Sequence, residues 1–170
     1  MSLCKKGVSV LAQLRRQKYL LPREVRKTLI SSLLFPVFDY ACPVFADMSC
    51  NSKLLIQRIQ NAGLRFVFDP WEANWLSMEK RRSFAYLVLL FKIICNRKPR
   101  YLSDLVMFGG STRINRQSLY TLRIPIHRTD KMRGSFAVFP ALLWNSLPTE
   151  LKTCKSLRTF RRLLFTHLLG

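Results

Sequence analysis

Apolar side chains recur every three or four residues along most of the chain, a period typical of helices that bury one face. The cleanest example predicts a helix over residues 52–68. Its predicted core face spans about 60° of the helix circumference and consists of Leu55, Ile59, Ala62 and Phe66. Polar residues gather elsewhere around the same helix, namely Arg58, Asn61 and Arg65.

An earlier helix is expected to start at Pro22, because proline suits the first helical turn and the carboxylate of Glu24 stabilises that end. Its predicted buried stripe is Val25, Leu29 and Leu33. Its predicted cationic face is Arg23, Arg26 and Lys27. Pro36 is expected to interrupt the apolar segment after this helix, since proline inside a helix removes a hydrogen bond and clashes with the preceding turn.

Further helical patterns cover residues 77–96, 101–106, 135–144 and 156–168. The first of these contains the apolar run 84–91, which indicates burial on several sides. The last has an inward set and an outward set. The inward set is Leu157, Phe160, Leu164 and Leu168, and the outward set is Lys155, Arg158 and Arg162. Residues 119–126 alternate imperfectly, which favours a short strand or an extended arm.

These patterns predict a mainly α fold with at most a short strand pair. We expect a helical bundle over residues 8–96, followed over residues 97–170 by a basic, mostly helical extension that ends in an amphipathic helix. The longest apolar run, residues 84–91, is far shorter than the ~20 residues of a membrane span. No secretory signal is recognisable, so we expect an intracellular protein that is neither secreted nor attached to a membrane.

Basic residues outnumber acidic ones by 29 to 9, which gives a formal net charge of +20 at pH 7. The excess is spread along the chain. Residues 1–96 include 15 basic and 6 acidic residues, and residues 97–170 include 14 basic and 3 acidic residues. Hydrophobic residues make up 49% of the sequence, too many for a disordered basic tail. A folded protein with this charge is expected to bind a polyanion, and the phosphates of nucleic acid are the partner it favours.

Side chains for acid–base and metal chemistry are scarce. With two histidines and nine carboxylates, we expect no catalytic residue, no metal site and no cofactor. Residues 45–48 look like the aromatic-Ala-Asp-Asp loop of reverse transcriptases, but Met48 replaces the second aspartate. Two-metal phosphoryl transfer needs several converging carboxylates, so a helix end or loop is favoured there. The five cysteines include no Cys-x-x-Cys spacing, and we expect reduced, mostly buried thiols.

Arginine can bind phosphate through two parallel hydrogen bonds, and aromatic rings can stack on unpaired bases. The candidate phosphate-binding residues are Arg23, Arg26, Lys27, Arg58, Arg65, Arg113, Arg116, Arg128, Arg158 and Arg162. For any one cluster, a solvated charged face is an equally good interpretation. Trp144 could stack on a base or pack the C-terminal helix, and its apolar neighbours favour packing. Pro148 and Phe160 are assigned structural roles with it.

Two long segments carry a family resemblance: residues 20–40, LLPREVRKTLISSLLFPVFDY, and residues 55–65, LIQRIQNAGLR. Shorter segments occur in order at residues 90–94, 99–102, 143–148 and 156–160. This ordered series resembles the region after the palm in non-LTR (LINE-type) retrotransposon reverse transcriptases. The resemblance covers residues 10–169 and implies a thumb-like bundle followed by a C-terminal extension.

The resemblance implies that this region binds RNA, DNA or an RNA–DNA template–primer duplex in that family. It also implies that the catalytic aspartates of the RNA-directed DNA polymerase belong to a fingers–palm part outside this chain. We therefore expect a fragment that is not an enzyme on its own, that has the fingers–palm part as a partner, and that is nuclear if functional. Two other hypotheses stay open: a protein-interaction or self-association remnant, and a degraded reading frame without function.

Overall fold

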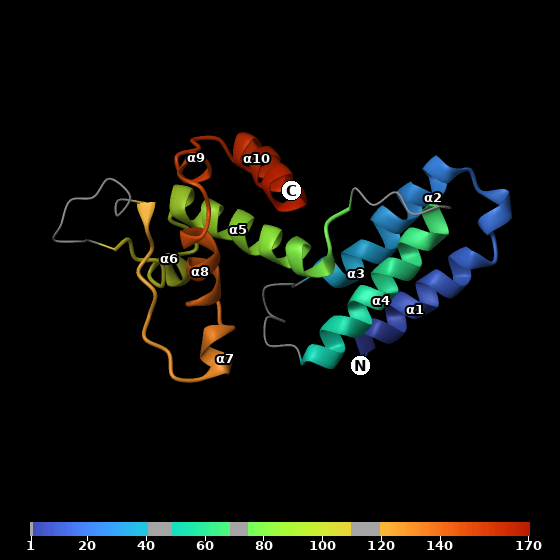
Figure 1. Ribbon diagram of the computed structural model, residues 1–170, viewed down its shortest axis with the longest axis horizontal. Helices are drawn as coiled ribbons and strands as arrows, with labels where there is room; N and C mark the ends of the chain where they lie inside the picture. The colour runs from blue at the N-terminus through green and yellow to red at the C-terminus, as the bar shows by residue number, and fades with distance from the viewer. Residues whose placement is uncertain (1, 41–48, 69–74, 110–119) are drawn as a thin grey trace. The chain divides into compact units, whose positions relative to one another are not determined.

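Helices dominate the computed structural model, which describes residues 2–40, 49–68, 75–109 and 120–170 (Figure 1). Of these residues, 71% are helical and none lies in a strand. One isolated antiparallel bridge pairs Phe108 with Leu122. The mainly α fold class predicted from the periodicity is confirmed.

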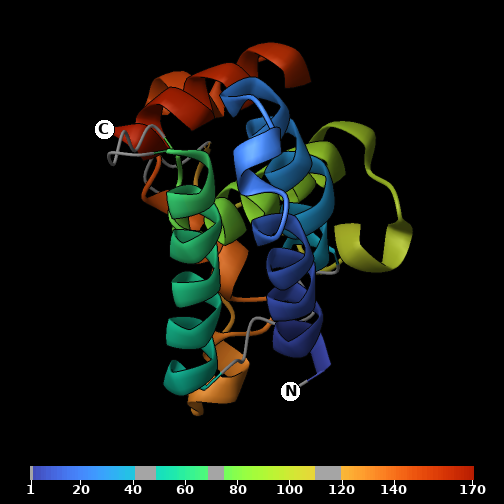
Figure 2. The same cartoon turned by 90° about the vertical axis from the view of Figure 1, so that its right-hand side faces the viewer.

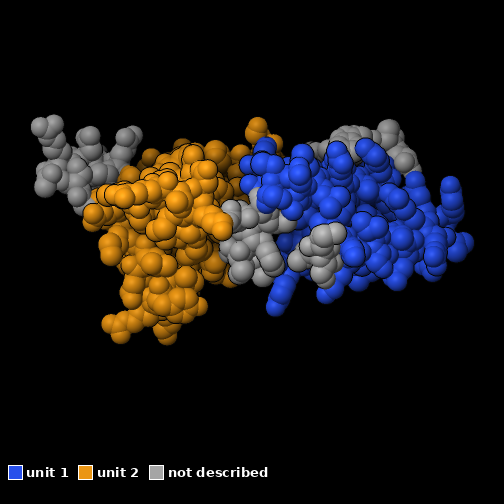
Figure 3. Space-filling model, turned by 90° about the horizontal axis from the view of Figure 1, so that it is seen from below, with its two compact units in different colours: residues 1–81 blue, residues 82–170 orange. Residues whose placement is uncertain are grey.

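The chain divides into two compact units, residues 1–81 and 82–170 (Figure 3). This boundary lies near the start of helix α5 (Met78–Asn96), whereas the sequence places it after residue 96. The apolar run of α5 explains the difference, because Leu87, Leu90 and Phe91 belong to the core of the second unit.

The first unit is a three-helix bundle. Helices α1 (Ser2–Arg15) and α4 (Cys50–Val67) run side by side (Figures 1 and 2). The bundle is completed by one continuous helical stretch, and a single 3₁₀ turn precedes that stretch. These elements are η1 (Lys18–Leu20), α2 (Arg23–Leu29), the π-helical η2 (Ile30–Leu34) and α3 (Phe35–Asp39). Two glycines allow close helix packing: a Cβ on Gly7 would lie 2.6 Å from Phe38 Cζ, and one on Gly63 would lie 2.7 Å from Leu34 Cδ2.

The buried stripe predicted over residues 25–33 is wrong at both ends. Val25 and Leu33 are exposed, while Ile30 and Leu34 are fully buried. The π-helical turn accounts for the second end, because its five-residue spacing carries Leu34 to the side that Leu33 would occupy in an α-helix. The same turn lets the helix continue through Pro36, which lies in the first turn of α3 and does not interrupt the chain.

The predicted core face of α4 needs a similar correction. Ile59 and Phe66 are buried as expected, but Leu55 is 44% exposed and its neighbour Ile56 only 2%. The buried side contains Gln60 and Gly63, which an apolar pattern does not include. Gln60 belongs there because its Nε2 donates to the carbonyl of Leu76 at 2.7 Å.

The second unit packs α8 and α10 against α5 (Figure 1). Its helices besides the greater part of α5 are α6 (Arg100–Ser103), α7 (Asp130–Arg133), α8 (Phe139–Asn145), α9 (Thr149–Lys152) and α10 (Leu157–Leu169). The ring of Phe160 stacks on Phe91 with a centroid distance of 4.3 Å. On α10, Phe160 and Leu164 are fully buried, and Arg158 and Arg162 are exposed, so the predicted facing of this helix is confirmed.

Trp144 is buried in this core with 2% of its surface exposed, and it lies 6.1 Å from Phe160 between ring centroids. Its Nε1 donates to the carbonyl of Tyr120 at 2.9 Å. The neighbouring Asn145 side chain accepts from the amide of Leu122 at 2.8 Å and donates to its carbonyl at 2.9 Å. Adjacent residues of α8 therefore fix the incoming segment through its backbone.

The structure decides between the two alternatives for one segment of this unit and corrects the start of one predicted helix. Of the alternatives for residues 119–126, the extended arm describes residues 120–126, which form no strand and pair with residues 107–109 through the isolated bridge between Phe108 and Leu122. The helix expected over 135–144 begins only at Phe139, with Pro140 in its first turn, where a missing N–H costs nothing. Pro148 lies exposed directly before α9.

The corrected face of α4 is testable by a pair of substitutions. Ile56→Ala should lower the free energy of unfolding by about 2–4 kcal/mol, because it leaves a cavity in the core. Leu55→Ala should cost about 1 kcal/mol or less, since much of that side chain is already in water. Urea unfolding of both variants measures the difference, and a larger loss for Leu55→Ala would restore the face predicted from the sequence.

Candidate nucleic-acid interface

Two predicted cations, Arg58 and Arg65, lie on the solvent side of α4, opposite its buried face. Both are exposed, and neither has a carboxylate partner in the described part of the chain. They are seven residues apart, so their Cα atoms are separated by about 10 Å along the helix axis. Asn61, predicted on the same face, is half-buried and accepts from Gln57.

The outer side of α10 carries a second set of exposed cations. Arg158 and Arg162 are one helical turn apart, and no ion pair engages either of them among the residues that the structure describes. Arg161 and Lys155 are also exposed beside them. Arg161 was not among the predicted binding residues. Its position next to Arg162 in the sequence is the feature that could have indicated it.

The three cations predicted on α2 have different surroundings. Lys27 is exposed and makes no ion pair within the described ranges. Arg23 is exposed, and its guanidinium lies 4.7 Å from the centroid of the Phe68 ring. Arg26 is half-buried, and its Nη1 donates to the carbonyl of Phe66 at 2.8 Å. That carbonyl lies in the last turn of α4, where helix carbonyls lack intrahelical partners and a cation is stabilising.

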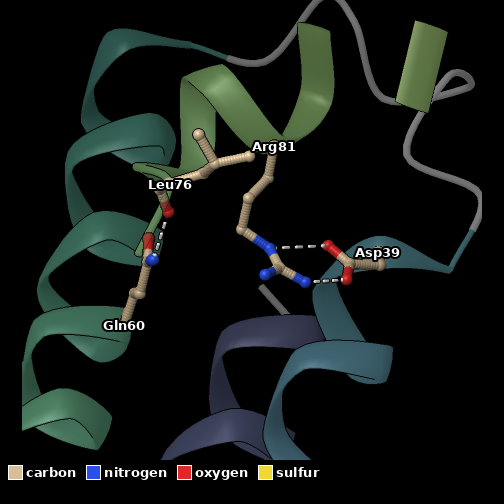
Figure 4. A network of polar contacts seen from close by, with 4 residues as sticks. All are labelled: Asp39, Gln60, Leu76 and Arg81. Carbon is tan, nitrogen blue, oxygen red and sulfur yellow. Dashed lines mark hydrogen bonds and ion pairs between the residues drawn. The ribbon is translucent and has the colours of Figure 1, made fainter. Parts of the chain in front are cut away.

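Arg81 is also held inside the first unit, by a network of polar contacts (Figure 4). Its guanidinium pairs with the carboxylate of Asp39, with Nε donating to Oδ1 at 3.3 Å and Nη2 to Oδ2. The same group lies 4.2 Å from the centroid of the Phe35 ring. These contacts tie the N-terminal turn of α5 to α3, so Arg81 has a structural role.

The remaining predicted cations lie in the second unit. Arg128 is exposed just before α7, and it has no ion-pair partner within the described ranges. Lys131 and Arg133 on α7 are exposed too, and the sequence pattern missed them because it predicts no helix there. Arg113 and Arg116 lie outside the described residues, as does the string 45–48.

Lys152 differs from these surface cations. Its Nζ donates to the carbonyl of Asn145 at 2.9 Å, which caps the C-terminal end of α8. Partial burial lowers the pKa of Lys152 below its ordinary value. Its ammonium group is therefore used inside the fold.

The expectation of mostly buried thiols is wrong for Cys50 and Cys95, which are exposed, while Cys4 and Cys154 are half-buried. These four cysteines are free, and Cys42 lies outside the described residues. Within the described ranges, no three His, Cys, Asp or Glu side chains come together to hold a metal ion. Nor is any described helix both long and apolar enough to span a membrane.

Comparison with known proteins supplies no relative: no family model, no curated protein and no solved structure matches this chain. Its chemistry therefore has to be inferred from its own residues. Those residues fall into two groups. One group of arginines is bound to rings, carbonyls or a carboxylate within the fold, and the other lies on the solvent sides of helices without an ion-pair partner among the described residues.

This division predicts effects of different size on the free energy of unfolding for two arginines. Arg26→Gln should lower the free energy of unfolding by about 1–2 kcal/mol, because a charge-assisted hydrogen bond to a helix carbonyl is lost. Arg65→Gln should change it by less than about 0.5 kcal/mol. Thermal or urea unfolding compares the two at equal loss of charge. Equal destabilisation would contradict the division.

Proposed function

We propose that the protein binds RNA, DNA or an RNA–DNA duplex through phosphate contacts and has no catalytic activity of its own. The observation that carries the proposal is a set of solvent-facing cations without carboxylate partners in the described part of the chain. They are Lys27, Arg58, Arg65, Arg128, Arg158 and Arg162.

Arginine on a helix surface suits this role because its planar guanidinium forms bidentate hydrogen bonds with phosphate. The charge of the chain supports the same partner, since 29 basic residues face only 9 acidic ones. Contacts of this kind recognise the backbone of a nucleic acid and carry no base sequence. Binding should therefore be strong at low salt and nearly independent of base sequence.

The ordered segments that resemble non-LTR retrotransposon reverse transcriptases support a more specific proposal. The chain corresponds to the thumb and C-terminal extension of such an enzyme, whose parent activity is RNA-directed DNA polymerisation. The partner protein would then be the fingers–palm part, and the place of action would be the nucleus. In this proposal the chain binds the nucleic acid and supplies no metal-binding carboxylate.

A second candidate function rests on apolar exposure. Several large apolar side chains lie almost entirely in solvent, among them Tyr19, Tyr40 and Ile126. Such groups favour contact with another protein or self-association. That function would show as complexes that survive high salt, because apolar association is not screened by ions.

The proposed phosphate contacts predict a salt dependence that single residues control. Affinity for a structured RNA should fall steeply as KCl rises, because each neutralised phosphate releases counterions. Replacing Arg58 and Arg65 together by glutamine should reduce the slope of log K against log salt by about one to two units. Fluorescence anisotropy over a KCl series measures this slope.

The matched control is the double variant Lys5→Gln and Lys6→Gln, which removes the same charge from exposed positions on α1. It should change the slope much less. Equal slopes for both double variants would mean that net charge alone attracts the RNA. An unchanged slope in the Arg58 and Arg65 variant would show that this side of α4 is only solvated.

A further inference from the structure

The turn between α1 and α2 projects two large apolar side chains into water. Tyr19 is 98% exposed and Leu20 is 83% exposed, and both lie in the 3₁₀ turn η1. Scattered apolar residues are common on protein surfaces. Two adjacent large apolar side chains at nearly full exposure are less common, because burial in the fold stabilises neither of them.

The backbone on both sides of this pair is held in place. The amide of Gln17 donates to the carbonyl of Leu14 at 3.1 Å, and the amide of Leu20 donates to the carbonyl of Gln17 at 3.1 Å. Leu14 is buried in the core of the first unit, and Leu21 packs against the same core. The turn is thus anchored before and after its exposed pair, so the direction in which Tyr19 and Leu20 project is fixed by the fold.

Basic residues are concentrated in the sequence on both sides of the turn. Between residues 15 and 27 the chain has six basic side chains and one acidic side chain, Glu24. Arg15 is the last residue of α1 and Arg16 follows it; both are exposed, with no ion-pair partner in the ranges that the structure describes. Lys27 is exposed on α2. An aromatic and an aliphatic side chain flanked by cations match a ligand that has both flat apolar faces and negative charge.

We propose that Tyr19 and Leu20 contact unpaired bases of single-stranded RNA or DNA, while the surrounding cations contact its phosphates. This inference rests on the proposed function and names the form of nucleic acid that this turn recognises. The phenol ring stacks on a base, and the leucine packs against the same or the next base. Bases inside a continuous duplex already stack on one another, so their faces are open to such contacts only where the strand is unpaired.

A lipid surface fits this turn less well. Interfacial segments bury a whole apolar helix face or combine several apolar groups, because one short insertion gives only marginal binding. Here two side chains are available, and the neighbouring helix positions carry charge. The first unit also has exposed cations outside this turn, Arg58 and Arg65 on α4.

Binding of the full chain to labelled oligoadenylate and to a blunt RNA duplex tests this assignment. Tyr19→Ala should weaken oligoadenylate binding about 5- to 100-fold, leave the salt slope unchanged because no charge is lost, and change duplex binding by less than about twofold. Tyr19→Phe should bind like the native protein, because the ring is kept. Because the Tyr19 side chain is almost fully exposed, the Tyr19→Ala variant should have the same melting temperature as the native protein.

The control is Tyr40→Ala. Tyr40 is 80% exposed in the same unit and has no basic residue among its close sequence neighbours, so its loss should leave oligoadenylate binding intact. Native protein that binds neither ligand would overturn the proposed function and this inference together. Salt-dependent binding that Tyr19→Ala leaves unchanged would overturn this inference alone. A Tyr19→Ala variant that loses binding to phosphatidylserine vesicles but keeps its binding to oligoadenylate would also overturn this inference alone.

Discussion

With 29 basic residues and nine acidic ones, most cations of this protein cannot form an ion pair within the chain. Each remaining cation must lie against some other electron-rich group or stay in water, because burying an unpaired charge is very costly. The first unit uses aromatic faces for this purpose. A continuous series of contacts runs from Arg81 over Phe35 at 4.2 Å, to Trp75 at 4.8 Å, to Phe68 at 6.4 Å, and ends under Arg23 at 4.7 Å.

That series connects segments that are distant in sequence. It joins α2 and α3 to the residue that ends α4 and to the segment that leads into α5. Each contact between a guanidinium and a ring contributes about 0.5–2 kcal/mol, so the two ends of the series stabilise the first unit while they accommodate charge. Arg26 does the same at the carbonyl of Phe66. These arginines are used by the fold, and the cations that remain on the surface form the proposed binding groups.

Because α4 and α10 each have buried core residues on one side and exposed cations on the other, the core and the proposed interface depend on each other. The buried side of α4 orients Arg58 and Arg65 outward, and the buried Phe160 and Leu164 of α10 orient Arg158 and Arg162 outward. Within each of these two helices the backbone fixes the spacing between the Cα atoms of the exposed arginines.

Helical periodicity was enough to predict the fold class and the inward face of α10. It failed where the helix geometry itself changes, because nothing in the apolar pattern indicates the π-helical turn that buries Leu34 in place of Leu33. It failed again on α4, where a buried polar residue, Gln60, takes a place in the core through a tertiary hydrogen bond.

For the candidate site, residue type and spacing found the solvent-facing arginines. The same reasoning could not separate Arg26 from Arg65, since the difference lies in which carbonyl or ring each guanidinium meets after folding. The exposed pair at Tyr19 was missed for the same reason, because a tyrosine beside two leucines gives no sign in the sequence of which side chains will be buried.

Chemical footprinting of arginine tests the central claim most directly. The chain is treated with phenylglyoxal with and without RNA at low salt, and modified peptides are quantified by mass spectrometry. The account predicts that Arg58, Arg65, Arg158 and Arg162 react in the free protein and are protected by RNA, while Arg26 and Arg81 react slowly in both samples. Equal reactivity of Arg26 and Arg65, or no protection of the α4 and α10 arginines by RNA, would contradict it.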